Sequence, residues 1–102
     1  MRNTAPERIA RGSLAFVPRI SQFYGIVIAM YYDDHAPPHF HAYYSGEEAT
    51  FRISDVSLLE GRLPRRAEPL VREWAAQHRE ELVENWWKAR DAKPLDKIPG
   101  LE

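Results

Sequence analysis

Hydrophobic and polar positions follow two different periods along this chain. Between residues 25 and 59, apolar residues stand in short β-branched and aromatic runs or alternate with polar residues, which is typical of strands. From Leu63 onward they recur every three or four residues, which is typical of an amphipathic helix. The period changes near Gly61, so the sequence predicts an α+β fold in which a sheet is followed by a helix that covers one of its faces.

The first half of the chain predicts a small antiparallel sheet, a meander of three or four strands. Proline donates no backbone hydrogen bond and holds the residue before it in an extended conformation, so Asp-Asp-His-Ala-Pro-Pro at residues 33–38 ends the first strand. Ser45-Gly46-Glu47 is a turn of hairpin length between two further strands. The expected strands are residues 25–32, 39–44, 48–53 and a short fourth at 56–59.

The second half predicts one long helix that begins near Leu63 and ends near Asp91. Pro64 or Pro69 suits its first turn, where a missing amide hydrogen has no helical partner. Beyond the helix, residues 94–101 carry spaced apolar side chains, and we expect them to dock as an irregular C-terminal strap. The apolar stripe of the helix consists of Ala67, Leu70, Val71, Trp74, His78, Leu82, Trp86 and Ala89.

Composition narrows the class of protein. The chain has 102 residues, which suits one domain, and its content of 44% hydrophobic and 28% charged residues is ordinary for a globular protein. It has no cysteine, which excludes disulfides, thiolate metal sites and cysteine nucleophiles. No apolar run approaches the ~18 residues of a membrane span, and the N-terminus lacks the apolar stretch of a secretory signal, so we expect a cytoplasmic protein.

Residues 1–16 differ from the rest of the chain. They mix arginine, proline and glycine with apolar residues without a sustained period, and we interpret them as a basic N-terminal arm ahead of a single domain at residues 17–102. Residues 1–24 carry four arginines against one glutamate, whereas the remainder has an excess of four acidic residues. Such an arm is either solvated or in contact with nucleic acid or an acidic partner.

Several short motifs stand out in addition to these periods. They are Pro18-Arg-Ile, Gly25 ahead of an aromatic strand, Pro37-Pro38-His39-Phe40-His41-Ala-Tyr, Glu60-Gly61-Arg-Leu63-Pro64, Trp74, His78-Arg-Glu-Glu-Leu82 and Trp86. In these motifs the chain resembles, over residues 17–99, the small prokaryotic family known as domain of unknown function 4160. The Pro-Pro-His-x-His block is the most specific part of the likeness. The resemblance implies a small antiparallel sheet covered by helix, and a product of small bacterial or phage operons with a regulatory or toxin–antitoxin label. It implies no reaction.

Histidines give the strongest chemical signal. His35, His39 and His41 fall within seven residues, and the strand period points His39 and His41 to the same face. Neutral imidazole is a common ligand for zinc, iron, copper and nickel, and a His-x-His pair on a strand can chelate one ion. We therefore predict a divalent metal, zinc or a similar ion, at His39 and His41, with His35 or an aspartate completing the set. A site without cysteine is expected to keep an open, catalytic position.

The histidines also suit acid–base catalysis. Helical geometry places His78 near the middle of the apolar stripe, so it can meet His39 and His41 if these face the helix. Two histidines with separated pKa values can remove and donate a proton, as cleavage of RNA requires. This makes His39, His41 and His78 candidate catalytic residues of a hydrolase or ribonuclease. The acidic body of the chain argues against strong nucleic-acid binding.

A third interpretation gives the histidines no chemistry. Pro37 and Pro38 supply no amide hydrogen, so carbonyls near the turn need other donors, and His35 and His39 can provide them. His78 can in the same way donate to a carbonyl or a hydroxyl of the sheet and so fix the helix.

Among functions, the sequence favours a small interaction module of regulatory, toxin–antitoxin-like type that acts through a protein partner encoded in the same operon. The metal-dependent or acid–base hydrolase is the alternative. Trp74 and Trp86 are expected in the core, whereas Trp87 lies about 100° further around the helix and is expected to be exposed, which suits a partner surface. The apolar segment at residues 14–17 and an open sheet edge predict a homodimer.

Overall fold

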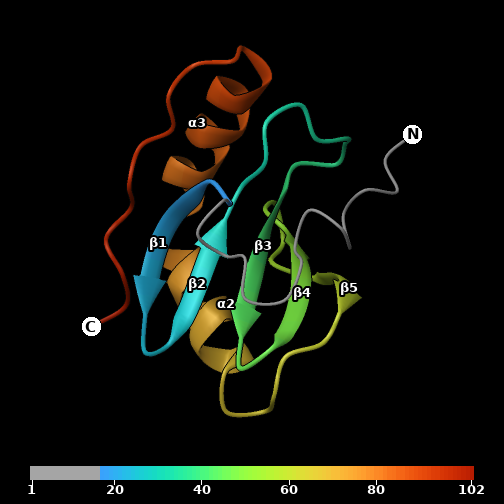
Figure 1. Ribbon diagram of the computed structural model, residues 1–102, viewed down its shortest axis with the longest axis vertical. Helices are drawn as coiled ribbons and strands as arrows, with labels where there is room; N and C mark the ends of the chain where they lie inside the picture. Colours follow the sequence, from blue (N-terminus) through green and yellow to red (C-terminus); the bar gives the residue numbers. More distant parts are fainter. Residues whose placement is uncertain (1–16) are drawn as a thin grey trace.

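The computed structural model describes residues 17–102, in which five strands precede two helices (Figure 1). The α+β class and the antiparallel meander are confirmed, but the sheet has five strands rather than three or four. The N-terminal arm, and most of the apolar segment at residues 14–17, lie outside the described residues. The strands are β1 Arg19–Phe23, β2 Ile26–Ala29, β3 His39–Tyr44, β4 Glu47–Arg52 and β5 Leu58–Gly61, and the helices are α2 Glu68–Gln77 and α3 Arg79–Arg90.

The strand that the sequence pattern does not predict is β1. The five strands are adjacent in chain order, and each pair is antiparallel. A two-residue turn joins β1 to β2, with φ of 49° at Tyr24 and 80° at Gly25. Positive φ at both central residues is the pattern of a tight hairpin turn, so Gly25 closes a hairpin instead of beginning a strand. β1 itself lacks clean alternation, because Ile20 and Ser21 are consecutive and both buried.

The two faces of the sheet have different roles. On β3, Phe40 and Ala42 belong to the main core, which also contains Phe51 of β4 and Trp74 of α2. Their neighbours alternate to the opposite face, where a second cluster consists of Val17, Val27, Ala29, Tyr31 and Tyr43. Figure 1 shows α2 against the first of these faces. His39 and His41 therefore lie on the sheet face that α2 does not cover.

The predicted long helix is two helices that meet at His78. This residue has φ −120° and ψ 28°, so it leaves the helical conformation between α2 and α3. Its backbone amide donates to the carbonyl of Trp74 at 3.1 Å, and its own carbonyl accepts a hydrogen bond from the amide of Leu82 at 2.9 Å. The apolar stripe continues across the break, since Trp74, Leu82 and Trp86 are all buried. The periodicity therefore carried no signal of the interruption.

The C-terminal strap docks along the first strand of the sheet. The amide of Ile98 donates to the carbonyl of Ile20 at 2.7 Å, and the indole Nε1 of Trp74 donates to the carbonyl of Pro99 at 2.8 Å. Figure 1 shows this segment running beside β1. The strap thus covers the β1 edge, whereas β5 ends the sheet on the other side within residues 17–102. None of the helices in this part of the chain has the length and apolarity that a membrane crossing requires.

Candidate metal centre

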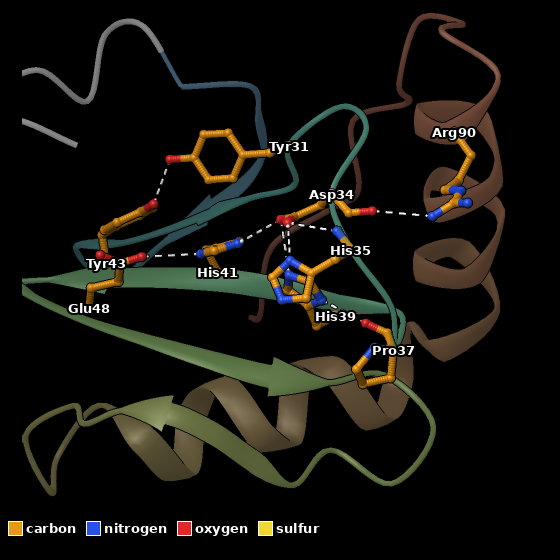
Figure 2. Close-up of polar contacts among 9 residues, drawn as sticks. All are labelled: Tyr31, Asp34, His35, Pro37, His39, His41, Tyr43, Glu48 and Arg90. Carbon is orange, nitrogen blue, oxygen red and sulfur yellow. Dashed lines mark hydrogen bonds and ion pairs between the residues drawn. The ribbon is translucent and has the colours of Figure 1, made fainter. Parts of the chain in front are cut away.

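The polar centre of the molecule lies where the β2–β3 connection folds back onto β3. Asp34 comes from that connection, and His39 and His41 come from β3 (Figure 2). Two residues apart on a strand, the two histidines point to the same side. The connection is also held by Arg90 of α3, whose Nη1 donates to the backbone carbonyl of Asp34 at 3.2 Å. The turn before it uses a positive φ of 58° at Asp33.

One carboxylate oxygen is shared by two imidazole rings. The Oδ2 atom of Asp34 lies 3.0 Å from Nε2 of His39 and 3.3 Å from Nε2 of His41. One ligand atom from each of these three side chains can be chosen so that all lie within 4.8 Å of one another. The three side chains are almost fully buried, with 2%, 4% and 8% of their areas exposed. This group could therefore hold a metal ion.

The other nitrogen of each ring is held by an acceptor. Nδ1 of His39 lies 2.7 Å from the carbonyl of Pro37, and Nδ1 of His41 lies 3.1 Å from Oε2 of Glu48 on β4 (Figure 2). A carbonyl and a carboxylate can only accept, so each of these two contacts is a hydrogen bond only when Nδ1 carries the hydrogen. In a neutral imidazole the Nε2 atom is then a bare acceptor, and here it faces a carboxylate oxygen. A proton or a cation between them is required to make this arrangement favourable.

Electrostatics at the centre follow from these contacts. Burial acts to raise the pKa of the Asp34 carboxyl, but hydrogen bonds from His39 and His41 outweigh it and hold that pKa well below its usual value. Burial acts to lower the pKa of His41, but its hydrogen bonds to Asp34 and Glu48 outweigh it and raise that pKa. The centre therefore strongly favours a negative Asp34 with positive charge beside it.

Aromatic rings surround the two histidines. The ring centroid of Trp86 lies 5.2 Å from that of His39, and the ring of Tyr31 meets His41 edge-on at 4.8 Å. The hydroxyls of Tyr31 and Tyr43 are 2.6 Å apart and share a hydrogen bond. An apolar shell of this kind lowers the local dielectric and restricts the access of water to the centre.

His35 stands at the exposed side of the group. Its backbone amide donates to Oδ1 of Asp34 at 2.9 Å, and its ring Nδ1 lies 3.1 Å from the same oxygen. The side chain is 68% exposed, although its ring centroid is only 5.4 Å from that of His39. Of the three histidines of the predicted metal site, the structure therefore places two inside the group and one at its rim.

His78 and Trp87 lie elsewhere. The ring of His78 contacts Trp74 at 5.5 Å between centroids, and its Nδ1 pairs with the carboxylate of Glu81. The structure therefore does not bring His78 together with His39 and His41, which face the other side of the sheet. Trp87 is 57% exposed on α3, while Trp74 and Trp86 are buried as predicted.

Two carboxylates, those of Asp34 and Glu48, contact the histidines of the centre. The sequence leaves open whether His35 or an aspartate joins His39 and His41, and in the structure Asp34 makes the contact. The signal for it was its position directly before the proline-rich turn. Glu48 was missed, because its role depends on the strand register: His41 lies opposite Thr50, so Glu48 reaches it diagonally.

The chemistry open to this group is that of a two-histidine, one-carboxylate site. Zinc, iron and related divalent ions accept such ligands, and donors at ~2.0–2.1 Å from a tetrahedral ion stand roughly 3.3 Å apart. Two of the three donor separations, the contacts of 3.0 and 3.3 Å to Oδ2 of Asp34, are close to that spacing. Histidines that bind metal usually donate their other ring N–H to a backbone carbonyl or a carboxylate, and these are the groups that Nδ1 of His39 and of His41 face here.

Comparison with known proteins supports the family seen in the motifs. No curated protein and no solved structure showed significant similarity to this chain. The model of one family, described as Domain of unknown function (DUF4160), matches residues 25–87, which run from the β1–β2 turn into α3 and contain the whole candidate centre. This match is narrower than the resemblance over residues 17–99, but it spans more than half of the sequence, and the protein belongs to the DUF4160 family.

Proposed function

We propose that this protein is a small metal-binding module whose centre holds one divalent transition-metal ion, with zinc as the first candidate. The ligands are Oδ2 of Asp34 and the Nε2 atoms of His39 and His41. The observation that carries the proposal is the pairing of two ring nitrogens with one carboxylate oxygen while both Nδ1 atoms face other acceptors. We propose the Pro-Pro-His-x-His block as the motif that builds this centre.

Burial of the ligands favours binding over turnover. Catalytic zinc sites keep an open position for water or substrate, whereas structural sites are closed. The nearly complete burial of Asp34 and His39, together with the aromatic shell, leaves little room for a substrate. An ion at this position would join the β2–β3 connection to β3 and would thereby stabilise a small domain. The hydrolase or ribonuclease is the second candidate, and it requires the exposed rim at His35 to admit a substrate.

The direct test is metal binding by the full chain after treatment with a chelator. Titration calorimetry with zinc is expected to give one site per chain, and elemental analysis of the dialysed protein should agree. At a free zinc concentration of about 100 times Kd, the native state gains about 2.7 kcal/mol, which appears as a raised melting temperature. His39→Gln and His41→Gln are expected to lose most of this binding, and His78→Gln serves as the matched control outside the centre.

Two outcomes would contradict the metal proposal. Wild-type protein that binds neither zinc nor cobalt at micromolar concentration would leave the histidines as hydrogen-bonding groups, in which imidazolium hydrogens satisfy Asp34. Folded His39→Gln and His41→Gln proteins that bind zinc as tightly as the wild type would place the ion elsewhere. Circular dichroism of each variant shows whether it is folded.

A role in protein interaction is a second proposal, which concerns the exposed face of α3. It is supported by Trp87, 57% exposed, and by Val83 one turn before it, which is also exposed. A partner encoded beside this chain, as in regulatory or toxin–antitoxin-type operons, is suggested by the family resemblance alone. Co-purification of co-expressed neighbours tests it, with Trp87→Ala expected to lose the complex and Tyr24→Ala, another exposed aromatic residue, expected to retain it. If both variants retain the complex, the proposed role of α3 is contradicted.

Self-association is a third proposal, and it is supported by the outer edge of β5, which pairs with no other strand within residues 17–102. Leu58 on this strand is exposed, and unpaired strand edges are ready sites for a second chain. Light scattering at tens of micromolar tests it, since a monomeric mass would contradict the homodimer. Leu58→Lys is expected to shift any dimer toward monomer, because a charged residue at a sheet edge disfavours pairing.

A further inference from the structure

The metal centre has a fourth donor at its rim, and the structure places that donor against the ligating carboxylate. Asp34 uses its two oxygens for different partners: Oδ2 faces His39 and His41, whereas Oδ1 faces His35. The backbone amide of His35 also donates to Oδ1, so two contacts fix the residue at this position. Its Nδ1 thus lies 3.1 Å from the carboxylate oxygen next to the one that would bind the ion.

Three protein ligands leave one corner of a tetrahedral ion vacant. Glu48, the other carboxylate beside the group, accepts the Nδ1 hydrogen of His41 and would have to release that ring to turn inward. His35 has no such commitment to the core, because its side chain is 68% exposed. Its ring stands 5.4 Å from that of His39 between centroids, outside the group of three donors, so it must turn toward them to share an ion.

We propose that His35 is an exchangeable fourth ligand, which turns from the Oδ1 side of Asp34 onto the bound ion and closes the centre. The inference rests on the proposed metal site and adds how that site is completed and opened. Three buried donors bind the ion first, and the exposed imidazole then replaces the last water. Tyr32 and Asp33, which stand three and two residues before His35, are exposed. Closure at His35 therefore fixes the exposed part of the β2–β3 connection, so the ion controls the surface presented there.

Chemical modification of the full chain separates the two states of His35. Diethyl pyrocarbonate acylates accessible neutral imidazole, and His35 is expected to react fastest among the four histidines of the metal-free protein. When zinc saturates the site, its rate is expected to fall by about an order of magnitude or more. Peptide mass mapping reads each histidine separately, and His78, which pairs with Glu81 away from the centre, is expected to react equally with and without zinc.

A binding measurement supplies the second readout. His35→Ala is expected to weaken zinc binding by about 10- to 100-fold, and to change the visible absorption of the cobalt-loaded protein because a nitrogen ligand is lost. His35 is exposed, so this variant is expected to fold. Asp33→Asn is the matched control, since it alters a nearby exposed residue, suits the positive φ at that position and removes no donor that contacts Asp34.

The outcomes distinguish this inference from the metal site itself. Absence of zinc binding by the wild type overturns both. Zinc binding with unchanged His35 reactivity overturns the fourth ligand alone, even if His35→Ala weakens binding, because a residue that only positions Asp34 would stay open to the reagent. Protection of His35 together with a changed cobalt spectrum in His35→Ala supports it.

Discussion

Glu48 on β4 holds the imidazole of His41 on β3 through a contact of 3.1 Å between Oε2 and Nδ1. The two residues are diagonal neighbours in the strand register, in which Glu48 stands opposite Tyr43. When Nδ1 donates to Glu48, Nε2 is the nitrogen that faces Asp34. A glutamate two strand positions removed thus determines which nitrogen of His41 is available to an ion.

Removal of this contact should weaken metal binding without removing a ligand. Glu48→Ala is expected to reduce zinc affinity by about 10- to 100-fold, the usual effect of losing an outer partner of a metal-binding histidine. Glu47→Ala is the matched control, because it removes the same charge from the adjacent exposed position. Competition with a chromophoric zinc chelator measures both. Equal affinities for the two variants would show that Glu48 does not orient His41.

The metal-free protein should be most stable at mildly acidic pH. The pKa of Asp34 is lowered in the folded state, so its contribution is present above its unfolded value of about 4 and is lost as the pH falls toward its folded pKa. The pKa of His41 is raised, so its contribution is complete below the unfolded value of about 6.5 and is lost as the pH rises through the folded pKa. Stability should therefore be highest between about pH 4 and pH 6.5.

Urea unfolding in the presence of a chelator, at intervals from pH 3 to pH 9, measures this profile. The alkaline decline is expected to disappear in His41→Gln, which has no group to titrate, and to remain in His78→Gln. Added zinc should reverse the decline above pH 7, because the ion replaces the hydrogens that leave the imidazoles. A flat free energy of unfolding from pH 6 to pH 9 without metal would contradict the coupling of His41 to Asp34 and Glu48.

The spacing of apolar and polar residues predicts those strands and helices whose formation depends on neighbouring residues in the sequence. The β3 strand at residues 39–44 was predicted with its observed bounds, and alternation alone placed His39 and His41 together. β1 was missed because its hairpin depends on positive φ at Tyr24, a residue with no propensity for that conformation. The break at His78 was missed because the buried stripe has the same spacing on both sides of it.

The candidate site was predictable only to the extent that its residues are close in sequence. The Pro-Pro-His-x-His block identified the place, and Asp34 stood beside it as one of several possible partners. Glu48 and Trp86 reach the histidines through strand register and helix packing, which no spacing in the sequence expresses. The separation of His78 depends on which face of the sheet carries β3 side chains of odd number, and the sequence left both possibilities open.

Gly61 should tolerate substitution far less well than Gly46. Both have positive φ, 74° and 83°, so alanine is strained at either position. A Cβ atom at Gly61 would also lie 2.2 Å from the backbone carbonyl oxygen of Glu48, whereas at Gly46 it meets open space. Gly46→Ala is expected to cost about 1 kcal/mol and Gly61→Ala about 2 kcal/mol or more, as urea unfolding would show. Similar losses for both would mean that β5 does not pack this closely on β4.

Trp86 should report the arrival of an ion at the centre. Its ring lies 5.2 Å from His39, whereas Trp87 next to it is exposed. Cobalt, a paramagnetic ion with the ligand preferences of zinc, is expected to quench the emission of Trp86 and to saturate at one ion per chain. Trp86→Phe should lose most of this quenching and Trp87→Phe should keep it, while prior loading with zinc should prevent it in both. Quenching that survives in Trp86→Phe would place the cobalt nearer another tryptophan, and so away from Asp34, His39 and His41.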